Sequence, residues 1–180
     1  MIKEEISMNG CIVKITKGKY SNADAVENVI NYIYKGAKNE LSPGERIYGA
    51  IGCGSTCKKE VIDAFKKIKK IYKKMGRNQL KHIVVSFGKK PDVFVKIIEK
   101  AVREIVRFFT NGEMPEGNFL VAYGVHYNKA ENYHLHICIS SVSNKGKRLN
   151  VTGKVLKRFK DYVDKIWEKV LLKENPFCEF

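Results

Sequence analysis

Two runs rich in β-branched and aromatic residues, FLVAYGVHYN (119–128) and NYHLHICISSV (132–142), follow one another with a short polar connection. This pair limits the possible folds more than any other feature of the chain. Two strands this close in sequence pair antiparallel, because a parallel pair needs a crossover of about a dozen residues or more. The sequence therefore predicts a hairpin with Lys129 and Glu131 in its turn.

The other segments alternate between the two periodicities of regular structure. Alternating or β-branched runs predict strands over residues 11–18, 46–54 and 80–87. Apolar residues at helical spacing predict helices over residues 20–38, 58–75, 91–109 and 152–171. The first helix is expected to begin with Ser21 or Asn22 as its N-cap, and the third with Pro91 in its first turn.

The order of these elements alternates strands with helices until the hairpin, which a last helix follows. This order predicts an α+β fold, a largely antiparallel β-sheet with helices packed on one face. No repeat, low-complexity tract or long linker interrupts the sequence, so we expect residues 1–180 to form one domain.

The charge is strongly unbalanced, with 34 Lys and Arg against 19 Asp and Glu and a net charge of +15. Such an excess indicates a polyanionic partner, most often nucleic acid. Lysines crowd one side of the helix expected over residues 58–75, where they form either a DNA-binding surface or a solvated face. The candidate phosphate contacts are Lys66, Lys70, Lys73 and Arg77.

The sequence predicts a cytoplasmic protein without a membrane segment. MIKEEISMNG lacks the apolar region of a signal peptide, and no apolar run approaches the roughly 18 residues that a membrane span requires. The five cysteines are odd in number and contain no CxxC pair. They are therefore expected to be free thiols in a reducing compartment.

Three histidines are placed where the hairpin would bring them together. His134 and His136 are two apart on a strand and so point to one face, while Leu135 and Ile137 point to the other. His126 lies on the preceding strand, about 5 Å away once the strands pair. Three neutral imidazoles leave coordination positions open, which is typical of a catalytic metal site.

A lone histidine on a strand is more often a satisfied structural residue than a ligand. Two histidines on one face with a third across a hairpin favour the metal interpretation. The fourth histidine, His82, has no such neighbours in the sequence and is expected to be either structural or DNA-facing.

The segment HYNKAENYHLHICISSVSNKGKRL resembles the third motif of HUH endonucleases, in particular of MobP-type relaxases. In that motif an upstream histidine precedes an HxH pair, and the matching residues are His126, His134 and His136. AVENVINYIYKGAK resembles the first motif, a helix whose tyrosine is the nucleophile, here Tyr32. HIVVSF resembles the second motif, whose serine helps to hold DNA near the cleaved phosphate, here Ser86.

The resemblance implies a ferredoxin-like or RRM-like palm and a metal-dependent, site- and strand-specific DNA nickase. Tyr32 would attack phosphorus, form a 5′-phosphotyrosine, free a 3′-hydroxyl and later rejoin strands. A divalent ion, Mg²⁺ or Mn²⁺, would polarise the phosphate. Asn132, ahead of the HxH pair, and Lys35, after the tyrosine, would contact DNA. The implied partners are single-stranded DNA at a transfer origin, in plasmid or integrative-element mobilization, and accessory relaxosome proteins.

Two departures keep alternatives open. Asn128 stands where the family usually has an acidic residue, although Glu131 lies close by, so a catalytically inactive, basic nucleic-acid-binding module is one alternative. The nucleophile is also not unique, because Tyr34 is two residues from Tyr32. In HUH replication initiators and transposases the tyrosine follows the HxH strand, as Tyr162 does in DYVDK, although Tyr162 also continues an apolar stripe.

Overall fold

The computed structural model describes residues 11–16, 18, 20–39, 42–74, 78–89, 91, 93–127 and 132–172. The elements along the chain are β1 (Ile12–Ile15), α1 (Ala25–Asn39), the short 3-10 helix η1 (Pro43–Glu45), β2 (Tyr48–Ile51), α2 (Lys58–Ile71), β3 (Leu80–Lys89), α3 (Val95–Arg107), β4 (Phe119–Tyr127), β5 (Asn132–Ser143) and α4 (Gly153–Leu171). This is the predicted order of strands and long helices.

Two helices begin later than the sequence predicts. A turn precedes α1, with the amide of Ala25 donating to the carbonyl of Asn22 at 3.2 Å, so neither Ser21 nor Asn22 is the N-cap. The third helix begins at Val95, and its N-cap is Phe94 rather than a residue next to Pro91. Cap signals at the sequence level compete with local turns, and here the turns prevail.

The five strands form one sheet in the order β1-β3-β5-β4-β2, and every neighbouring pair is antiparallel. The predicted hairpin is confirmed, since β4 and β5 pair with His126 opposite His134 and Val125 opposite Leu135. The hairpin occupies the middle of the sheet, because β3 pairs with the other edge of β5. An α+β fold with an antiparallel sheet follows, as expected.

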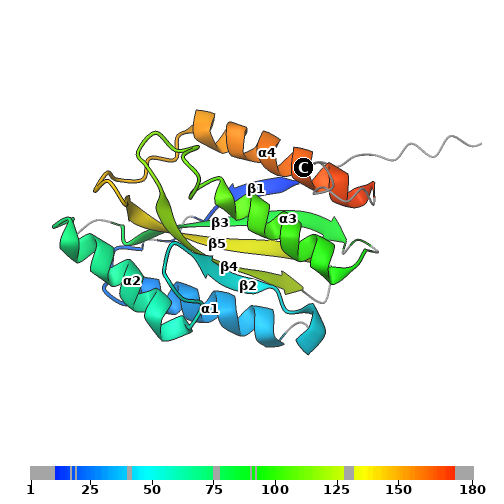
Figure 1. Cartoon of the computed structure of the whole chain (residues 1–180), viewed down its shortest axis with the longest axis horizontal. Coiled ribbons are helices and arrows are strands. Elements are labelled where there is room, and N and C mark those ends of the chain that lie inside the picture. Colours follow the sequence, from blue (N-terminus) through cyan, green and yellow to red (C-terminus); the bar gives the residue numbers. More distant parts are fainter. Residues whose placement is uncertain are drawn as a thin grey trace, which may run out of the picture.

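The helices cover both faces of the sheet, so the expectation that they lie on one face is wrong. Figure 1 shows α1 and α2 on one side of the strands and α3 and α4 on the other. Two separate apolar clusters match these layers, one with residues of α1 and α2 and a larger one with residues of α3 and α4. An apolar stripe shows that a helix packs on something but carries no information about which face of a sheet it covers.

Alternate residues of β5 point to opposite faces of the sheet. Leu135, Ile137 and Ile139 are completely buried in the cluster beneath α3 and α4. Burying one such side chain stabilises the fold by about 1.5–3 kcal/mol. Cys138 is buried on the opposite face, in the cluster beneath α1 and α2. The two histidines of β5 therefore lie on the α1–α2 face, because they alternate with Leu135 and Ile137.

Two glycines let α1 lie unusually close to β4. A Cβ added to Gly124 would lie 2.8 Å from Cγ2 of Ile33, and one added to Gly36 would lie 2.2 Å from Cε1 of His126. Real Cβ atoms do not approach other heavy atoms so closely, so any larger residue would displace the helix or the imidazole. The backbone of α1 is thus brought into contact with a histidine of the sheet.

The described residues contain four free cysteines, Cys11, Cys53, Cys57 and Cys138. Burial raises the pKa of the Cys138 thiol, which keeps this side chain a neutral core residue at physiological pH. Among the helices of the described ranges, none has both the length and the apolar character needed to cross a membrane.

Candidate functional site

The three histidines of the hairpin lie in adjacent positions on the α1–α2 face of the sheet. His134 pairs with His126 on one side and with Ser86 on the other. His136 follows two residues later, between Val84 and Gly124 in register. The ring centroids are 4.2 Å apart for His126 and His136 and 6.4 Å apart for His134 and His136. Pairing of the central strands therefore gathers these side chains.

The fourth histidine belongs to the same cluster, which sequence reasoning missed. Nε2 of His82 lies 3.0 Å from Nδ1 of His136, and the two nitrogens share a hydrogen bond. On its other side, Nδ1 of His82 is 3.2 Å from the hydroxyl of Tyr20. His82 is opposite Cys138 in the sheet register, two positions along β5 from His136. Strand alternation places His82 and Ser86 on one face of β3, but only the pairing of β3 with β5 brings His82 to His136.

Tyr32 extends from α1 over this cluster. Its ring centroid is 5.0 Å from that of His126, 5.3 Å from that of His136 and 6.4 Å from that of His82, all in edge-on contacts. The residue is nevertheless 53% exposed, which makes it one of the most exposed large aromatic residues described. A phenol packed against imidazoles and open to solvent can meet a substrate from outside.

The two rival tyrosines lie elsewhere. Tyr34 is buried in the core against Tyr48, with ring centroids 5.1 Å apart, and burial raises its pKa. Tyr162 lies on α4, across the sheet from the histidines, and its hydroxyl donates to Oε1 of Glu104 at 2.9 Å. Burial, followed by this bond to Glu104, raises the pKa of Tyr162. Of the three tyrosines considered as nucleophile, Tyr32 is the one that the structure places both at the surface and beside the histidines.

The backbone of α1 sets the orientation of the His126 ring. Nε2 of His126 lies 2.9 Å from the carbonyl oxygen of Ile33, and because a carbonyl can only accept, this nitrogen carries the proton. The lone pair of the neutral ring is then on Nδ1, which is the atom able to bind a cation. The ring occupies the space that Gly36 leaves open.

Two histidines of the cluster, His82 and His136, favour their neutral forms. Burial, followed by charge on His126, His82 and His134, lowers the pKa of His136 to about 2. Burial, followed by charge on His126, lowers the pKa of His82 to about 4. Both rings are therefore neutral at physiological pH, and the neutral imidazole is the form that binds metals.

The histidines suit a metal ion in the type of donor atom that they offer, but their rings are not oriented toward a common ion. Neutral imidazoles at neighbouring positions of one sheet face are suitable ligands for a divalent transition metal. Within the ranges that the structure describes, however, no group of three or more His, Cys, Asp or Glu side chains is arranged to hold a metal ion. His126, His134 and His136 therefore match a metal site in donor type and backbone register, although the planes of the His126 and His136 rings are tilted by 36° against each other.

The polar residues expected to contact DNA lie partly around the cluster. Ser86 is partly exposed and faces the same side of the sheet as His134, with which it pairs. Asn132 begins β5 and pairs in register with Lys89. Asn128 and Glu131 lie outside the described residues.

The basic candidates lie on the two helices of this face. Lys35 is exposed on α1, and Lys66 and Lys70 are exposed on α2, with Lys73 directly after that helix. Lys66 approaches Glu27 of α1, with Nζ and Oε2 3.5 Å apart at the surface. Arg77 lies outside the described residues. The candidates that are described thus share one side of the molecule with Tyr32 and the histidines.

Comparison with known proteins agrees with this geometry. The family described as "Relaxase: MobA/VirD2-like, nuclease domain" matches residues 32–172, which is most of the chain and includes Tyr32 and all four histidines. No curated protein matches the sequence. Relaxases of this family are nucleases that nick DNA, bind single-stranded DNA at an origin of transfer and generally depend on a metal ion. The chain therefore belongs to the relaxase family, with a nuclease domain of the MobA/VirD2-like kind.

Proposed function

We propose that this chain forms a relaxase domain that cuts one DNA strand at a specific site with Tyr32 and rejoins it by strand transfer. The observation that carries the proposal is the position of Tyr32. It is the exposed tyrosine whose ring packs against His82, His126 and His136. A nucleophile beside neutral imidazoles and accessible from solvent is the arrangement that covalent phosphodiester cleavage requires.

In the proposed reaction the hydroxyl of Tyr32 gives up its proton, and its oxygen attacks the phosphorus of the scissile phosphodiester. The new bond joins the Tyr32 oxygen to phosphorus, and the bond from phosphorus to the 3′ oxygen breaks. The 3′ oxygen takes up a proton and leaves as a 3′-hydroxyl, and the 5′ side stays attached to Tyr32. The energy of the broken bond is kept in the phosphotyrosine, so attack by a 3′-hydroxyl can reverse the reaction and join strands.

We propose that His126, His134 and His136 would hold a divalent ion. Such an ion would supply Lewis-acid polarisation of the phosphate. His126 can use Nδ1 without losing the bond from Nε2 to Ile33, and His136 can use Nε2 without losing its bond to His82. Imidazole ligands suit Mn²⁺ better than Mg²⁺, which prefers oxygen ligands, so we expect Mn²⁺ to bind more tightly.

The DNA strand is proposed to cross the α1–α2 face. Ser86 and Asn132 would contact it beside the histidines, and the positive side chains of both helices would contact its phosphates, with an affinity that falls as salt rises. These side chains are Lys35, Lys66, Lys70, Lys73 and Arg77. The proposed setting is the mobilization of a plasmid or integrative element in the cytoplasm, together with accessory relaxosome proteins.

The test is covalent capture of DNA. Wild-type protein is incubated with Mn²⁺ and a labelled single-stranded oligonucleotide that carries the transfer origin of its own genetic element, and the adduct is detected on a denaturing gel. We expect Tyr32→Phe to abolish the adduct, whereas Tyr162→Phe, the matched control across the sheet, retains it. An adduct that persists in Tyr32→Phe and disappears in Tyr162→Phe would contradict the proposal and favour an initiator or transposase.

The metal is tested separately from cleavage. Isothermal titration with Mn²⁺ is expected to detect one site in the wild type that His134→Ala and His136→Ala lose. If the wild type binds single-stranded DNA but neither Mn²⁺ nor Mg²⁺, the protein is instead a nucleic-acid-binding module without catalytic activity.

A further inference from the structure

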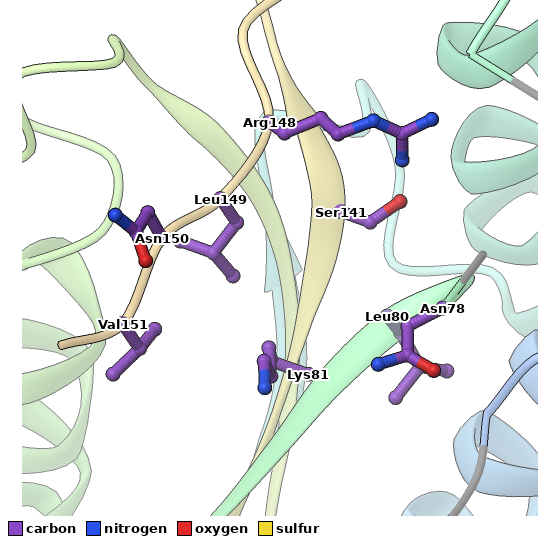
Figure 2. Close-up of a pocket in the computed structure, with 8 residues that line it drawn as sticks. All are labelled: Asn78, Leu80, Lys81, Ser141, Arg148, Leu149, Asn150 and Val151. Atoms are coloured by element: carbon purple, nitrogen blue, oxygen red, sulfur yellow. The ribbon is translucent and has the colours of Figure 1, made fainter.

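A polar cavity lies away from the histidine cluster, where β3 begins and β5 approaches its end. Its volume is about 250 Å³, and its polar lining consists of Asn78, Lys81, Ser141, Arg148 and Asn150. Figure 2 shows these side chains around the ends of the two strands and the segment that follows β5. None of the residues of Tyr32's cluster lines it, so the proposed nicking reaction does not account for it.

Among the described residues that line this cavity, the two charged ones are the cations Lys81 and Arg148. Lys69 of α2, outside the lining, is only 2% exposed, and its ammonium group donates to the neutral amide oxygen of Gln79. Burial lowers the pKa of Lys69, and the charge of Arg148 lowers it further. An anion beside Arg148 would offset this repulsion between the two cations.

One buried hydroxyl is left without a partner at this cavity. Ser141 is 8% exposed, and its Oγ is buried without a hydrogen bond. The neighbouring Ser140 provides a contrast, because its Oγ donates to the carbonyl of Val142 at 2.9 Å and accepts from the amide of Leu120 at 3.0 Å. In Figure 2 the hydroxyl of Ser141 points to the side of β5 on which the Arg148 guanidinium lies. An unused donor beside a cation is suited to an anionic oxygen.

The wall that carries Arg148 is fixed in place before any ligand binds. The amide of Leu149 donates to the carbonyl of Ser141 at 3.0 Å, which holds this segment against β5. Nη2 of Arg148 donates to the carbonyl of Lys74 at 3.5 Å, and the hydroxyl of Tyr72 donates to the carbonyl of Asn144. The end of α2 and the segment after β5 are therefore joined. A preformed cationic site loses little conformational entropy on binding.

We propose that this cavity binds one phosphate group of the same DNA strand that Tyr32 cuts. The guanidinium of Arg148 would neutralise the phosphate, and the hydroxyl of Ser141 would donate to one of its oxygens. The aliphatic side chains of Leu80, Leu149 and Val151 complete the lining and strengthen these contacts by excluding water. The inference rests on the proposed function for the identity of the strand, but not for the chemistry of the phosphate.

The position of the cavity suits a strand that reaches the histidines. Ser141 and His136 are both on β5, five positions apart, which at about 3.3 Å per residue is roughly 16 Å. This length corresponds to roughly five stacked nucleotides at 3.4 Å each. A phosphate bound here would hold the strand in register several nucleotides from the cut, independently of its base sequence.

The first test compares two arginines by fluorescence anisotropy with labelled oligothymidine. Arg148→Gln should weaken binding about tenfold, the size expected for a charge-assisted hydrogen bond, and reduce the salt dependence by about one phosphate contact. Arg158→Gln removes an equal charge from α4, where Arg158 pairs with Glu113 across a 3.0 Å contact, and should change binding less than twofold, about the size of a surface charge effect. Equal effects of the two variants would overturn the proposal.

The second test uses the adjacent serines. Ser141→Ala should lower the oligothymidine affinity about threefold without lowering the melting temperature, because no internal bond is lost. Ser140→Ala should lower the melting temperature and leave the affinity unchanged. If Ser141→Ala leaves binding unchanged in a folded protein, the hydroxyl is not a phosphate ligand and the proposal fails.

Two further measurements are needed. The first distinguishes free phosphate from a phosphate of DNA, and the second distinguishes a failure of this inference from a failure of the proposed function. Inorganic phosphate should shift the backbone amide signals of Ser141, Arg148 and Leu149, and oligothymidine should displace it. A phosphate that oligothymidine cannot displace would overturn the assignment to a DNA strand. Tyr32→Phe should keep the oligothymidine affinity of the wild type and lose the covalent adduct, whereas Arg148→Gln should raise the DNA concentration needed for half-maximal adduct formation, so either proposal can fail alone.

Discussion

The two faces of the sheet are built from alternate residues of the same strands, yet they have opposite properties. On the face beneath α3 and α4, β5 contributes Leu135, Ile137 and Ile139, all completely buried and apolar. On the face beneath α1 and α2, it contributes His134 and His136. The side chains of β5 that point to one face therefore fill the core, and those that point to the other face form the candidate site.

The helices differ in the same way. The buried residues of α3, such as Ile98 and Ile105, are all apolar and simply fill a core. On α1, by contrast, Gly36 leaves room for an imidazole and the carbonyl of Ile33 accepts a hydrogen bond from His126. A helix that packs on a functional face contributes its backbone as well as its side chains. Substitutions on the two faces should therefore fail for different reasons.

The largest expected effects come from substituting two neighbouring residues of β5, Leu135 and His134, which point to opposite faces of the sheet. Leu135→Ala should lower the free energy of unfolding by about 3 kcal/mol through lost burial and a cavity, while the folded fraction still forms the DNA adduct. His134→Ala should change that free energy by less than about 1 kcal/mol, since His134 is partly exposed, but should reduce adduct formation more than about a hundredfold. Urea denaturation and the denaturing gel measure the two quantities. The comparison would be wrong if His134→Ala strongly lowered the free energy of unfolding and its folded fraction still formed the DNA adduct as the wild type does.

Acid should destabilise the histidine face and not the apolar face. His82 has a pKa of about 4 in the folded protein and an ordinary value of 6.5, so the unfolded chain binds more protons between these values. The free energy of unfolding should therefore fall as pH is lowered through this window, by about 2 kcal/mol.

Urea denaturation of protein treated with EDTA at pH 7 and pH 5 measures this effect. His82→Gln should reduce the dependence on pH, whereas Leu135→Ala should lower stability by a similar amount at both pH values. A wild-type stability that stays constant across the window would show that the buried histidines do not resist protonation.

The close contact between α1 and His126 gives a smaller effect. Gly36→Ala should lower the free energy of unfolding by about 1–2 kcal/mol, although alanine is the better helix former, because its Cβ would meet the imidazole. Gly153→Ala is the matched control, since nothing lies within 4 Å of a Cβ at that position of α4. We expect the control to be neutral or slightly stabilising. A stable Gly36→Ala with an unchanged His126 ring signal in NMR spectra would contradict the packing described here.

The smallest effect concerns the exposed lysines. Lys70→Gln on α2 should weaken oligothymidine binding about threefold and reduce its salt dependence, as expected for the loss of one phosphate contact. Lys100→Gln on α3, on the opposite face, removes the same charge and should leave binding within error of the wild type. Equal losses would mean that DNA is attracted by net charge alone and does not prefer the α1–α2 face.

The parts of the fold that depend on local sequence could be predicted. The hairpin was predictable because β4 and β5 are separated by a short polar connection. The order of strands and helices along the chain was predictable from the periodicity of the apolar residues. The face that each helix covers could not be predicted, because it depends on the crossover between distant strands. The pairing of β3 with β5 is such a long-range fact.

The same limit explains the errors at the site. His82 has no histidine near it in sequence, and only the β3–β5 register brings it to His136. Lys69 has a different explanation that is local: it lies four residues after Phe65 and continues the inward-facing row of α2, so it is buried although it belongs to a lysine-rich helix. Tyr32 and Tyr34 are equivalent on a helical wheel until the sheet beneath α1 defines which flank is covered.

The order of strands also has a consequence for when the protein can become active. Of the neighbouring pairs in the sheet, β4 and β5 alone are consecutive in the chain, so His126 and His134 meet by closing a very short loop. Tyr32 is synthesised long before them, but the surface beneath α1 is completed only when β4 arrives. A growing chain therefore carries Tyr32, the proposed nucleophile, before the histidine cluster beside it is assembled. The proposed cutting activity should begin only after the hairpin has left the ribosome.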